Sequence, residues 1–308
     1  MIIFKAPQSE VLAALQAIVG IVEKRHTIPI LANVLIRKQG ENSELITSDL
    51  EIQMRNRVNL GGDEAENFST TIAMRKLIDI LRTLSPEQVV SLEQQDKKII
   101  LKGGKSRFTL QSLPADDFPL VQEASSYATT LVLAQKTLKK LLQQVAFAMA
   151  VQDIRHYLNG LLLQTNGKKL ALVTTDGHRL AYAEAELEQE MPAQEVILPR
   201  KTVLELLRLL DEHSEEPIEI AFASNQARFR FGKLEFVSKL VEGKFPDYNR
   251  VIPQNHQQNI TVSRTGLQAS LQRSAIMMSE KFKGVRLNIE HGLLRVASNN
   301  NEQEEAMD

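Results

Sequence analysis

Apolar residues near the N-terminus recur every three or four positions, which is the spacing of one face of a helix. They are Val11, Leu12, Leu15, Ile18, Val19 and Val22. This spacing predicts a helix that begins at about Ser9, with Ser9 as its N-cap. A short run from Ile2 to Lys5 precedes it and predicts a strand.

The pattern then changes to alternation of apolar and polar residues, which is typical of half-buried strands. Strands are predicted at Ala32–Arg37, Ser43–Thr47, Leu50–Asn59, Gln88–Glu93, Lys98–Lys102 and Ser106–Ser112. One further helix, Arg75–Leu84, interrupts them. Gln95-Asp96 and Gly103-Gly104 separate the last three runs, where hairpins need turns. These residues therefore predict a strand-rich unit with two helices.

The next part of the chain repeats this order. Strands are predicted at Thr130–Leu133, Tyr157–Thr165, Leu170–Thr174, Leu180–Ala185, Ile218–Phe222, Ala227–Phe231 and Leu234–Lys239, with helices at Lys136–Ala150 and Lys201–Leu210. Local motifs repeat as well. Thr47-Ser48-Asp49 returns as Thr174-Thr175-Asp176, and Met74-Arg75-Lys76-Leu77 returns as Pro199-Arg200-Lys201-Thr202. The spacing of about 125 residues is far above a solenoid period and fits whole domains in tandem.

A third copy begins with a predicted strand at Asn259–Val262. A helix at Thr265–Met278 and strands at Val285–Glu290 and Leu293–Ser298 follow. The second helix and the closing meander have no counterpart, so either the chain is a fragment or the protein has lost half a domain. We expect a fragment, since half of such a core folds poorly. The predicted domains are 1–123, 128–254 and 257–308, the last being a first half only. The predicted class is α+β, with two helices packed on antiparallel sheets in each full copy.

Composition narrows the functional classes. The chain has 308 residues, of which 43% are hydrophobic, with a net charge of −1 and no cysteine. The absence of cysteine excludes disulfides and Cys-based metal sites. The N-terminus lacks the pattern of a signal peptide, and no segment approaches the ~20 apolar residues of a membrane span. These features predict a soluble cytoplasmic protein that does not use a membrane.

Charge is distributed unevenly along the chain despite the neutral total. Basic and amide residues gather on the outer faces of the predicted helices: Arg75, Lys76, Arg82, Lys136, Lys139, Lys140, Gln143, Gln144, Arg200, Lys201, Arg208, Arg264 and Arg273. Acidic residues gather elsewhere, for example from Glu184 to Glu190 and from Asp211 to Glu216. A basic helical face attracts phosphates without reading bases. Ordinary solvation of helix surfaces explains the same pattern equally well.

Seven stretches of the chain resemble the bacterial DNA polymerase III beta subunit, the replicative sliding clamp, and they occur in the same order as in that family. They are HTIPILANVLI (26–36), SRFTLQSLPADDFP (106–119), QDIRHYLNGLLLQT (152–165), TTDGHRLA (174–181), LPRKTVLELLRLL (198–210), SKLVEGKFPDYNRVIP (238–253) and EKFKGVRL (280–287). Each stretch alone is a weak signal, and together they span nearly the whole chain.

The resemblance implies tandem copies of a DNA-clamp domain that form part of a ring. Two full-length chains would close head to tail as a homodimer around duplex DNA, without sequence specificity. The resemblance also implies a processivity factor with no catalysis and no cofactor. Its partners would be the DNA polymerase III alpha subunit, the clamp loader and other clamp-motif proteins. Its location would be the bacterial cytoplasm, at the nucleoid during replication.

The resemblance further implies three sets of residues. The peptide-binding groove would comprise Leu158, Thr175, Gly177, His178, Arg179, Leu180, Pro246, Arg250 and Val251. DNA contacts would come from Arg25, Gln152, His156 and Tyr157, with Arg82, Arg200 and Lys201 as weaker candidates. The dimer interface would comprise Arg75, Lys76, Lys105, Arg107, Phe108, Ile276, Met277, Glu302, Glu304 and Glu305. In each set the alternative is an ordinary structural role: sheet core for the leucines, solvated loops for the cations, and a charged edge strand for the interface.

Three other functions compete with this interpretation. An enzyme would use Asp176-Gly177-His178 as an acid–base pair, yet the sequence shows no nucleophile motif, phosphate loop or HExxH-like metal spacing. A non-replicative protein-interaction scaffold would keep the fold without DNA. A repeat protein that only binds DNA would lack the peptide groove.

Overall fold

The computed structural model describes residues 1–23, 27–63, 67–95, 98–278 and 284–299, together with the backbone of 305–307. It consists of two units, Met1–Pro246 and Asp247–Asp308. Every strand pairing in both units is antiparallel, and the predicted α+β class is confirmed. The division into two units does not test the three predicted domain ranges, which stay predictions.

The first module of unit 1 contains strands β1 to β9 and two α-helices. Its strands are β1 (Ile2–Pro7), β2 (Asn33–Gln39), β3 (Asn42–Ser48), β4 (Ile52–Asn59), β5 (Phe68–Ala73), β6 (Val89–Gln95), β7 (Lys98–Gly103), β8 (Ser106–Leu110) and β9 (Ser112–Leu113). Its helices are α1 (Gln8–Gln16) and α2 (Met74–Arg82), with short 3₁₀ turns η1 (Val19–Ile21), η2 (Pro29–Ala32) and η3 (Ala115–Asp117).

Helix α2 shows why the periodicity predicted a helix here. Met74, Leu77, Ile78 and Leu81 are buried, and they lie on one face at helical spacing. Helix α1 differs from expectation at its start. It begins at Gln8, its N-cap is Pro7, and no side chain caps it, so the predicted Ser9 cap is wrong. Strand β1 runs directly into α1, which leaves no turn in which Ser9 could act as the cap.

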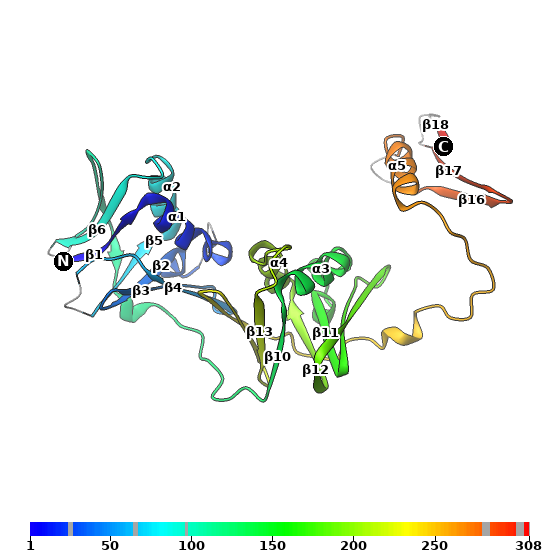
Figure 1. Cartoon of the computed structure of the whole chain (residues 1–308), viewed down its shortest axis with the longest axis horizontal. Helices are drawn as coiled ribbons and strands as arrows, with labels where there is room; N and C mark the ends of the chain where they lie inside the picture. Colours follow the sequence, from blue (N-terminus) through cyan, green and yellow to red (C-terminus); the bar gives the residue numbers. More distant parts are fainter. Residues whose placement is uncertain (24–26, 64–66, 96–97, 279–283, 300–304, 308) are drawn as a thin grey trace. The chain divides into compact units, whose positions relative to one another are not determined.

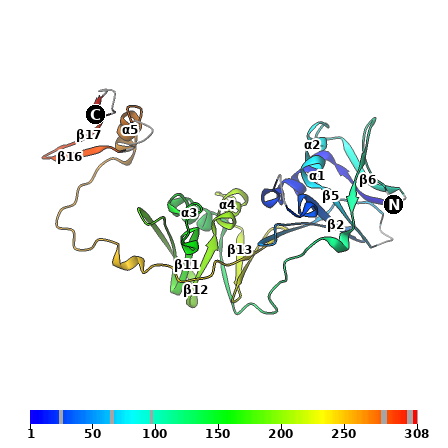
Figure 2. The same cartoon turned by 180° about the vertical axis from the view of Figure 1, so that it is seen from behind.

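The second module contains strands β10 to β15. They are β10 (Thr129–Ala134), β11 (Gly160–Thr175), β12 (Leu180–Pro199), β13 (Pro217–Phe222), β14 (Gln226–Phe231) and β15 (Leu234–Lys239). Its helices are α3 (Gln135–Val145) and α4 (Arg200–Leu209), with 3₁₀ turns η4 (Ala146–Ala148) and η5 (His156–Leu158). Figures 1 and 2 show the four α-helices along one side of unit 1, with the large sheet along the other.

Two predicted elements of this module have different limits in the structure. The predicted helix to Ala150 ends at Val145 and continues as the 3₁₀ turn η4. The predicted strand from Tyr157 begins only at Gly160, because His156, Tyr157 and Leu158 form η5. Strand β11 also merges two predicted strands into one, and its register against β12 shifts at Gly167, where φ is +57°.

One sheet runs through both modules. Its strand order is β10-β13-β14-β15-β4-β3-β2-β5-β9, and β15 pairs with β4 from Leu234↔Asn56 to Ser238↔Ile52. The last strand of one meander therefore continues the sheet of the preceding module. A smaller sheet, β1-β6-β7-β8, completes the first module, and β11 pairs with β12 to complete the second.

Unit 2 is small. It contains the 3₁₀ turn η6 (Tyr248–Arg250), helix α5 (Arg264–Ala275) and strands β16 (Arg286–Glu290), β17 (Leu293–Asn299) and β18 (Glu305–Met307). The Ser298 hydroxyl donates to the Ser274 carbonyl oxygen at 2.6 Å, which joins β17 to α5. The predicted strand at Asn259–Val262 is wrong. These residues are extended and exposed, and no described strand pairs with them.

Candidate functional site

The turn between β11 and β12 holds the exposed part of the predicted groove. The Asp176 carboxylate accepts backbone N–H donors from His178 at 2.9 Å and Arg179 at 3.0 Å, and the Arg179 Nε at 3.1 Å. Gly177 has a φ of +88°, a conformation that favours glycine. The turn is therefore set by one carboxylate and one glycine, and it presents His178 and Arg179 to solvent.

The electrostatics of this turn stabilise the ionised carboxylate. Hydrogen bonds from the His178 and Arg179 backbone are the main cause, and they lower the pKa of Asp176 from 3.8 to about 2. Asp176 is thus an acceptor at neutral pH and has no proton to donate.

A second loop, residues 147–158, carries the predicted DNA-contacting residues of the second module. Arg155 donates to Asp153 from its backbone N–H at 2.8 Å, its Nε at 3.0 Å and its Nη2 at 2.8 Å. The side chain of Asn159 closes the loop by accepting from Asp153 N–H and donating to the Asp153 carbonyl oxygen, both at 2.8 Å. The hydrogen bonds from Arg155 lower the pKa of Asp153 to about 2.

Two arginines join the loops. Arg155 Nη2 donates to the Asp176 carbonyl oxygen at 3.4 Å, and Arg179 Nη2 donates to the Phe147 carbonyl oxygen at 2.8 Å. The Arg179 guanidinium also lies 5.5 Å from the centre of the Phe147 ring. The loop that carries the predicted groove residue Arg179 and the loop that carries the predicted DNA-contacting residues Gln152, His156 and Tyr157 are therefore joined by hydrogen bonds. Sequence reasoning missed Asp153, Arg155 and Phe147. The Asp-x-Arg spacing of Asp153 and Arg155 was the one available signal that these two side chains pair.

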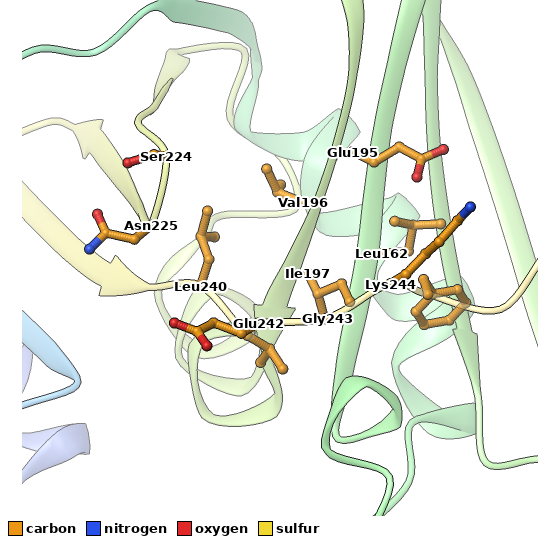
Figure 3. Close-up of a pocket in the computed structure, with 12 residues that line it drawn as sticks. Leu162, Glu195, Val196, Ile197, Ser224, Asn225, Leu240, Glu242, Gly243 and Lys244 are labelled. Atoms are coloured by element: carbon orange, nitrogen blue, oxygen red, sulfur yellow. The ribbon is translucent and has the colours of Figure 1, made fainter.

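A cavity of about 450 Å³ lies elsewhere on the second module, between the end of β12, the turn after β13 and the segment at 240–245 (Figure 3). Val196 and Leu240 line its apolar floor, while Glu195, Glu242 and Lys244 are exposed at its rim. None of the predicted groove residues lines it. The predicted groove, whose polar geometry is set by the two loops, is the better candidate site.

Two further properties concern the described part of the chain only. It contains no group of three or more His, Asp or Glu residues placed to hold a metal ion. None of its helices has the length and apolar character required to span a membrane.

Comparison with known proteins decides the family. Models of the N-terminal, central and C-terminal domains of the DNA polymerase III beta subunit match residues 2–122, 132–247 and 249–308. The beta sliding clamp of Pseudomonas aeruginosa is 42% identical over 98% of this chain and 82% of its own length. The chain belongs to the beta sliding clamp family. The Escherichia coli clamp is 39% identical over the same shares of the two chains.

Solved structures of clamps agree with this assignment. A crystal structure of the P. aeruginosa beta subunit has a TM-score of 0.92 and 40% identity, covering 99% of this chain and 82% of that one. Another P. aeruginosa clamp structure, with the same TM-score and identity, has griselimycin bound. Family membership establishes a role in DNA replication as the beta subunit of DNA polymerase III, a processivity subunit that is generally non-catalytic.

Seven of the nine clamp groove residues lie in unit 1. Leu158 is buried with 2% exposure, Thr175 and Leu180 are half-buried, and Gly177, His178, Arg179 and Pro246 are exposed. Arg250 and Val251 belong to unit 2, where both are exposed and Arg250 pairs with Asp247 at 2.9 Å. Their place in a common groove stays a prediction.

The predicted DNA-contacting residues of the clamp have different environments. Gln152 is exposed with a φ of +56°, and His156 and Tyr157 lie on η5 beside it. Arg82 is exposed at the end of α2, 3.7 Å from Asp79. Arg200 donates to the Met149 carbonyl oxygen at 3.3 Å, within its own module. Arg25 lies outside the described residues.

The predicted dimer residues of the first module lie on and around β8. Phe108 packs against the main core, while Lys105 and Arg107 are exposed, and Arg107 donates to Gln95 at 3.1 Å. On α2, Arg75 donates to the Val22 carbonyl oxygen and Lys76 is exposed. In unit 2, Ile276 is 77% exposed and Met277 is half-buried. Glu302 and Glu304, and the side chain of Glu305, lie outside the described residues.

Proposed function

We propose that the protein encircles duplex DNA as a head-to-tail dimeric ring and tethers the replicative polymerase and other clamp-motif proteins. It contacts DNA without sequence preference and catalyses no reaction itself. Its place of action is the bacterial cytoplasm, at the nucleoid. Its interface residues are those predicted for peptide binding and dimer closure, and those predicted for DNA contacts other than Lys201.

The observation that supports a ring is the junction between the two modules. The outer edge of β15 pairs with β4 of the preceding module. Strand β8 is the counterpart of β15, since each ends a three-stranded meander, and within the described residues its outer edge carries no strand. The start of β12 is the counterpart of β4, since each follows a repeated Thr-Ser/Thr-Asp motif. It too pairs on one edge only in the described part of the chain.

In the described part of the chain, unit 1 therefore has two unpaired edges. One, at β8, corresponds to the edge of β15, and the other, at the start of β12, corresponds to the edge of β4. Repetition of the β15–β4 pairing between modules would use both edges and leave none unpaired, which is what a closed ring of modules requires. The exposed cations Lys76, Lys105 and Arg107 lie around the β8 edge, where the acidic residues from 302 to 305 are expected in the partner. Opposite charges of this kind favour the correct pairing.

The helical side of unit 1 supports the contact with DNA. Arg82 and Lys140 are exposed there on α2 and α3, and the loop with Gln152 and His156 is exposed beside α3. Contacts of this kind neutralise phosphates and release counterions, so affinity falls with salt and does not depend on base sequence. Such weak, uniform contacts suit a clamp that slides.

The test of ring formation is retention on DNA of different topology. The full-length protein, loaded by a bacterial clamp loader with ATP, should stay on a nicked circular duplex and leave when the duplex is linearised. Release from both forms would favour a scaffold without a DNA partner, and equal retention on both would favour a repeat protein that binds DNA directly. A fluorescent clamp-motif peptide from the polymerase alpha subunit tests tethering separately.

A further inference from the structure

Helix α4 contacts the first module through Lys201, at its N-terminal end. The Lys201 ammonium donates to the Asp49 carboxylate, to Glu23 Oε1 at 3.0 Å and to the Ile21 carbonyl oxygen at 3.4 Å. All three acceptors belong to the first module. The Asp49 side chain is only 7% exposed, so its charge depends on Lys201 for compensation.

The far end of α4 makes a second contact through Arg208. Its Nη1 donates to the Gln16 carbonyl oxygen at 3.0 Å and its Nη2 to the Ala17 carbonyl oxygen at 2.9 Å. These carbonyls end helix α1, where acceptors lack intrahelical partners and the helix dipole favours a cation. Glu205 holds the guanidinium in place by accepting from its Nε at 2.9 Å.

The same interface includes a close backbone approach. A Cβ atom built on Gly20 would lie 2.1 Å from Glu205 Oε2, so glycine is required there unless Glu205 moves. Lys201 and Arg208 are seven residues apart, which places their contacts about 10 Å apart along the helix axis. Two contacts at this separation fix the direction of α4 relative to the first module, and one contact alone would not.

On the opposite face of the shared sheet, two buried glutamines form hydrogen bonds with the segment that connects the two modules. The side-chain oxygen of Gln53 accepts from Val121 N–H at 3.0 Å, and that of Gln226 accepts from Ala124 N–H at 2.9 Å. Gln226 Nε2 also donates to the Gln122 carbonyl oxygen at 2.6 Å. One glutamine comes from each module, and together they attach the connecting segment to the sheet. The β15–β4 pairing is thus supported on both faces.

We infer that Lys201 and Arg208 are positioning residues that set the angle between the two modules, and that Lys201 is not a phosphate contact. The inference concerns the joint itself and holds whether or not the molecule encircles DNA. Arg200 provides the contrast, because its guanidinium donates to the Met149 carbonyl oxygen of its own module. Burial lowers the pKa of Lys201, but the hydrogen bonds and charges of Asp49 and Glu23 outweigh it, so the pKa is raised and the ion pair persists at neutral pH.

The angle can be measured with spin labels because the chain contains no cysteine. Glu10→Cys on α1 and Gln144→Cys on α3 place one label on an exposed helical position of each module. Electron–electron resonance of the full chain should give one narrow distance distribution. Lys201→Met combined with Arg208→Met should broaden it at least twofold, because the β15–β4 pairing and the two glutamines would then have to hold the angle without the contacts of α4. Arg200→Met, the matched control, should leave the width unchanged.

An unchanged distribution in the double variant, with normal circular dichroism, would overturn the inference. If the double variant fails to fold, Asp49→Asn removes the same ion pair from the other module, and the same two labels report the result. The distance measurement needs no DNA, so its outcome is independent of the ring experiment. In a DNA titration the salt dependence should be unchanged by Lys201→Met, whereas a slope reduced by about 0.9 would reassign Lys201 to a phosphate.

Discussion

At the scale of single residues, the candidate site depends on two carboxylates whose structural role the sequence did not indicate. Asp153 and Asp176 each accept several hydrogen bonds from donors within three residues, and each has a pKa lowered to about 2. Two arginines then join the loops that these carboxylates shape. The exposed His178 and Arg179 owe their positions to this arrangement, so their roles are sensitive to charge changes nearby.

Replacement of Arg179 by alanine should weaken binding of a clamp-motif peptide about tenfold, or by about 1.4 kcal/mol. The change removes an exposed rim cation and its hydrogen bond to the Phe147 carbonyl oxygen. Fluorescence polarisation with a labelled peptide measures the effect. Arg82→Ala, an exposed arginine on α2, is the control and should bind as the parent does. Identical curves for all three proteins would contradict the groove assignment.

The turn at Asp176 should keep its structure from pH 8 down to about pH 4. The pKa in the folded state, about 2, lies below the ordinary value of 3.8. The ionised carboxylate therefore stabilises the turn at pH values above its ordinary pKa, and this stabilisation is lost as the pH falls through about 2. NMR titration of the Asp176 carboxyl carbon measures this directly. A midpoint at or above 3.8 would show that the hydrogen bonds do not stabilise the charge.

At the scale of elements, each strand forms where a neighbouring strand satisfies the hydrogen bonds of its backbone. β1 pairs with β6, and β10 pairs with β13, in each case before a helix. The corresponding run at Asn259–Val262 has the same alternation, yet no described strand pairs with it and it does not form one. Alternation of apolar and polar residues alone therefore indicates only a tendency to form a strand. Whether a strand forms depends on pairing with a neighbouring strand.

The outer edge of β8, on which the described residues place no strand, leads to a prediction about assembly. Phe108→Asp should shift the full-length protein from dimer to monomer, because Phe108 is placed as the apolar residue of the proposed interface and a carboxylate there would be desolvated. Sedimentation velocity measures the shift. Thr109→Asp, at the exposed neighbouring position, is the control. Because Phe108 also packs on the core, circular dichroism must confirm that the variant is folded. A folded variant that stays dimeric would contradict the interface.

At the scale of the whole molecule, the two modules of unit 1 share one polar network on the outer face of the sheet. The Arg55 guanidinium, in β4, contacts Glu44 at 3.1 Å, Glu123 at 3.1 Å and also Glu235. Glu235 belongs to β15 and also accepts from Arg230 at 2.8 Å. The Arg55 side chain is only 13% exposed, so the charge pairs that it forms are largely shielded from solvent. The network joins strands of both modules and the segment that connects them.

Removal of Arg55 should therefore destabilise unit 1 as a whole. Arg55→Met should lower the free energy of unfolding by about 2–4 kcal/mol, because it removes the cation that three partly buried carboxylates share. Urea denaturation followed by circular dichroism measures the loss. Arg37→Met is the control: Arg37 contacts Glu44 only at 3.9 Å, and its loss should cost less than about 0.5 kcal/mol. Equal effects of the two substitutions would show that the network does not hold the modules together.

The sequence by itself determined the repeated order of strands and helices, the apolar face of α2 and the family. These depend on local spacing and on motifs such as Thr174-Thr175-Asp176, which are written along the chain. It also pointed to His178 and Arg179, but only through the family resemblance. It did not show what holds them in place, because Arg155 and Phe147 reach this turn only after the chain folds back on itself.

Only the tertiary structure decided that β15 continues the sheet of the preceding module, and that Lys201 faces Asp49 and Glu23. Lys201 and Arg200 are adjacent and carry the same charge, so no pattern along the chain distinguishes them. Their positions on α4 distinguish them. Lys201 binds carboxylates that are 152 and 178 residues away in the sequence, whereas Arg200 contacts its own module. Long-range electrostatic pairing depends on distance in space, and local sequence does not encode that distance.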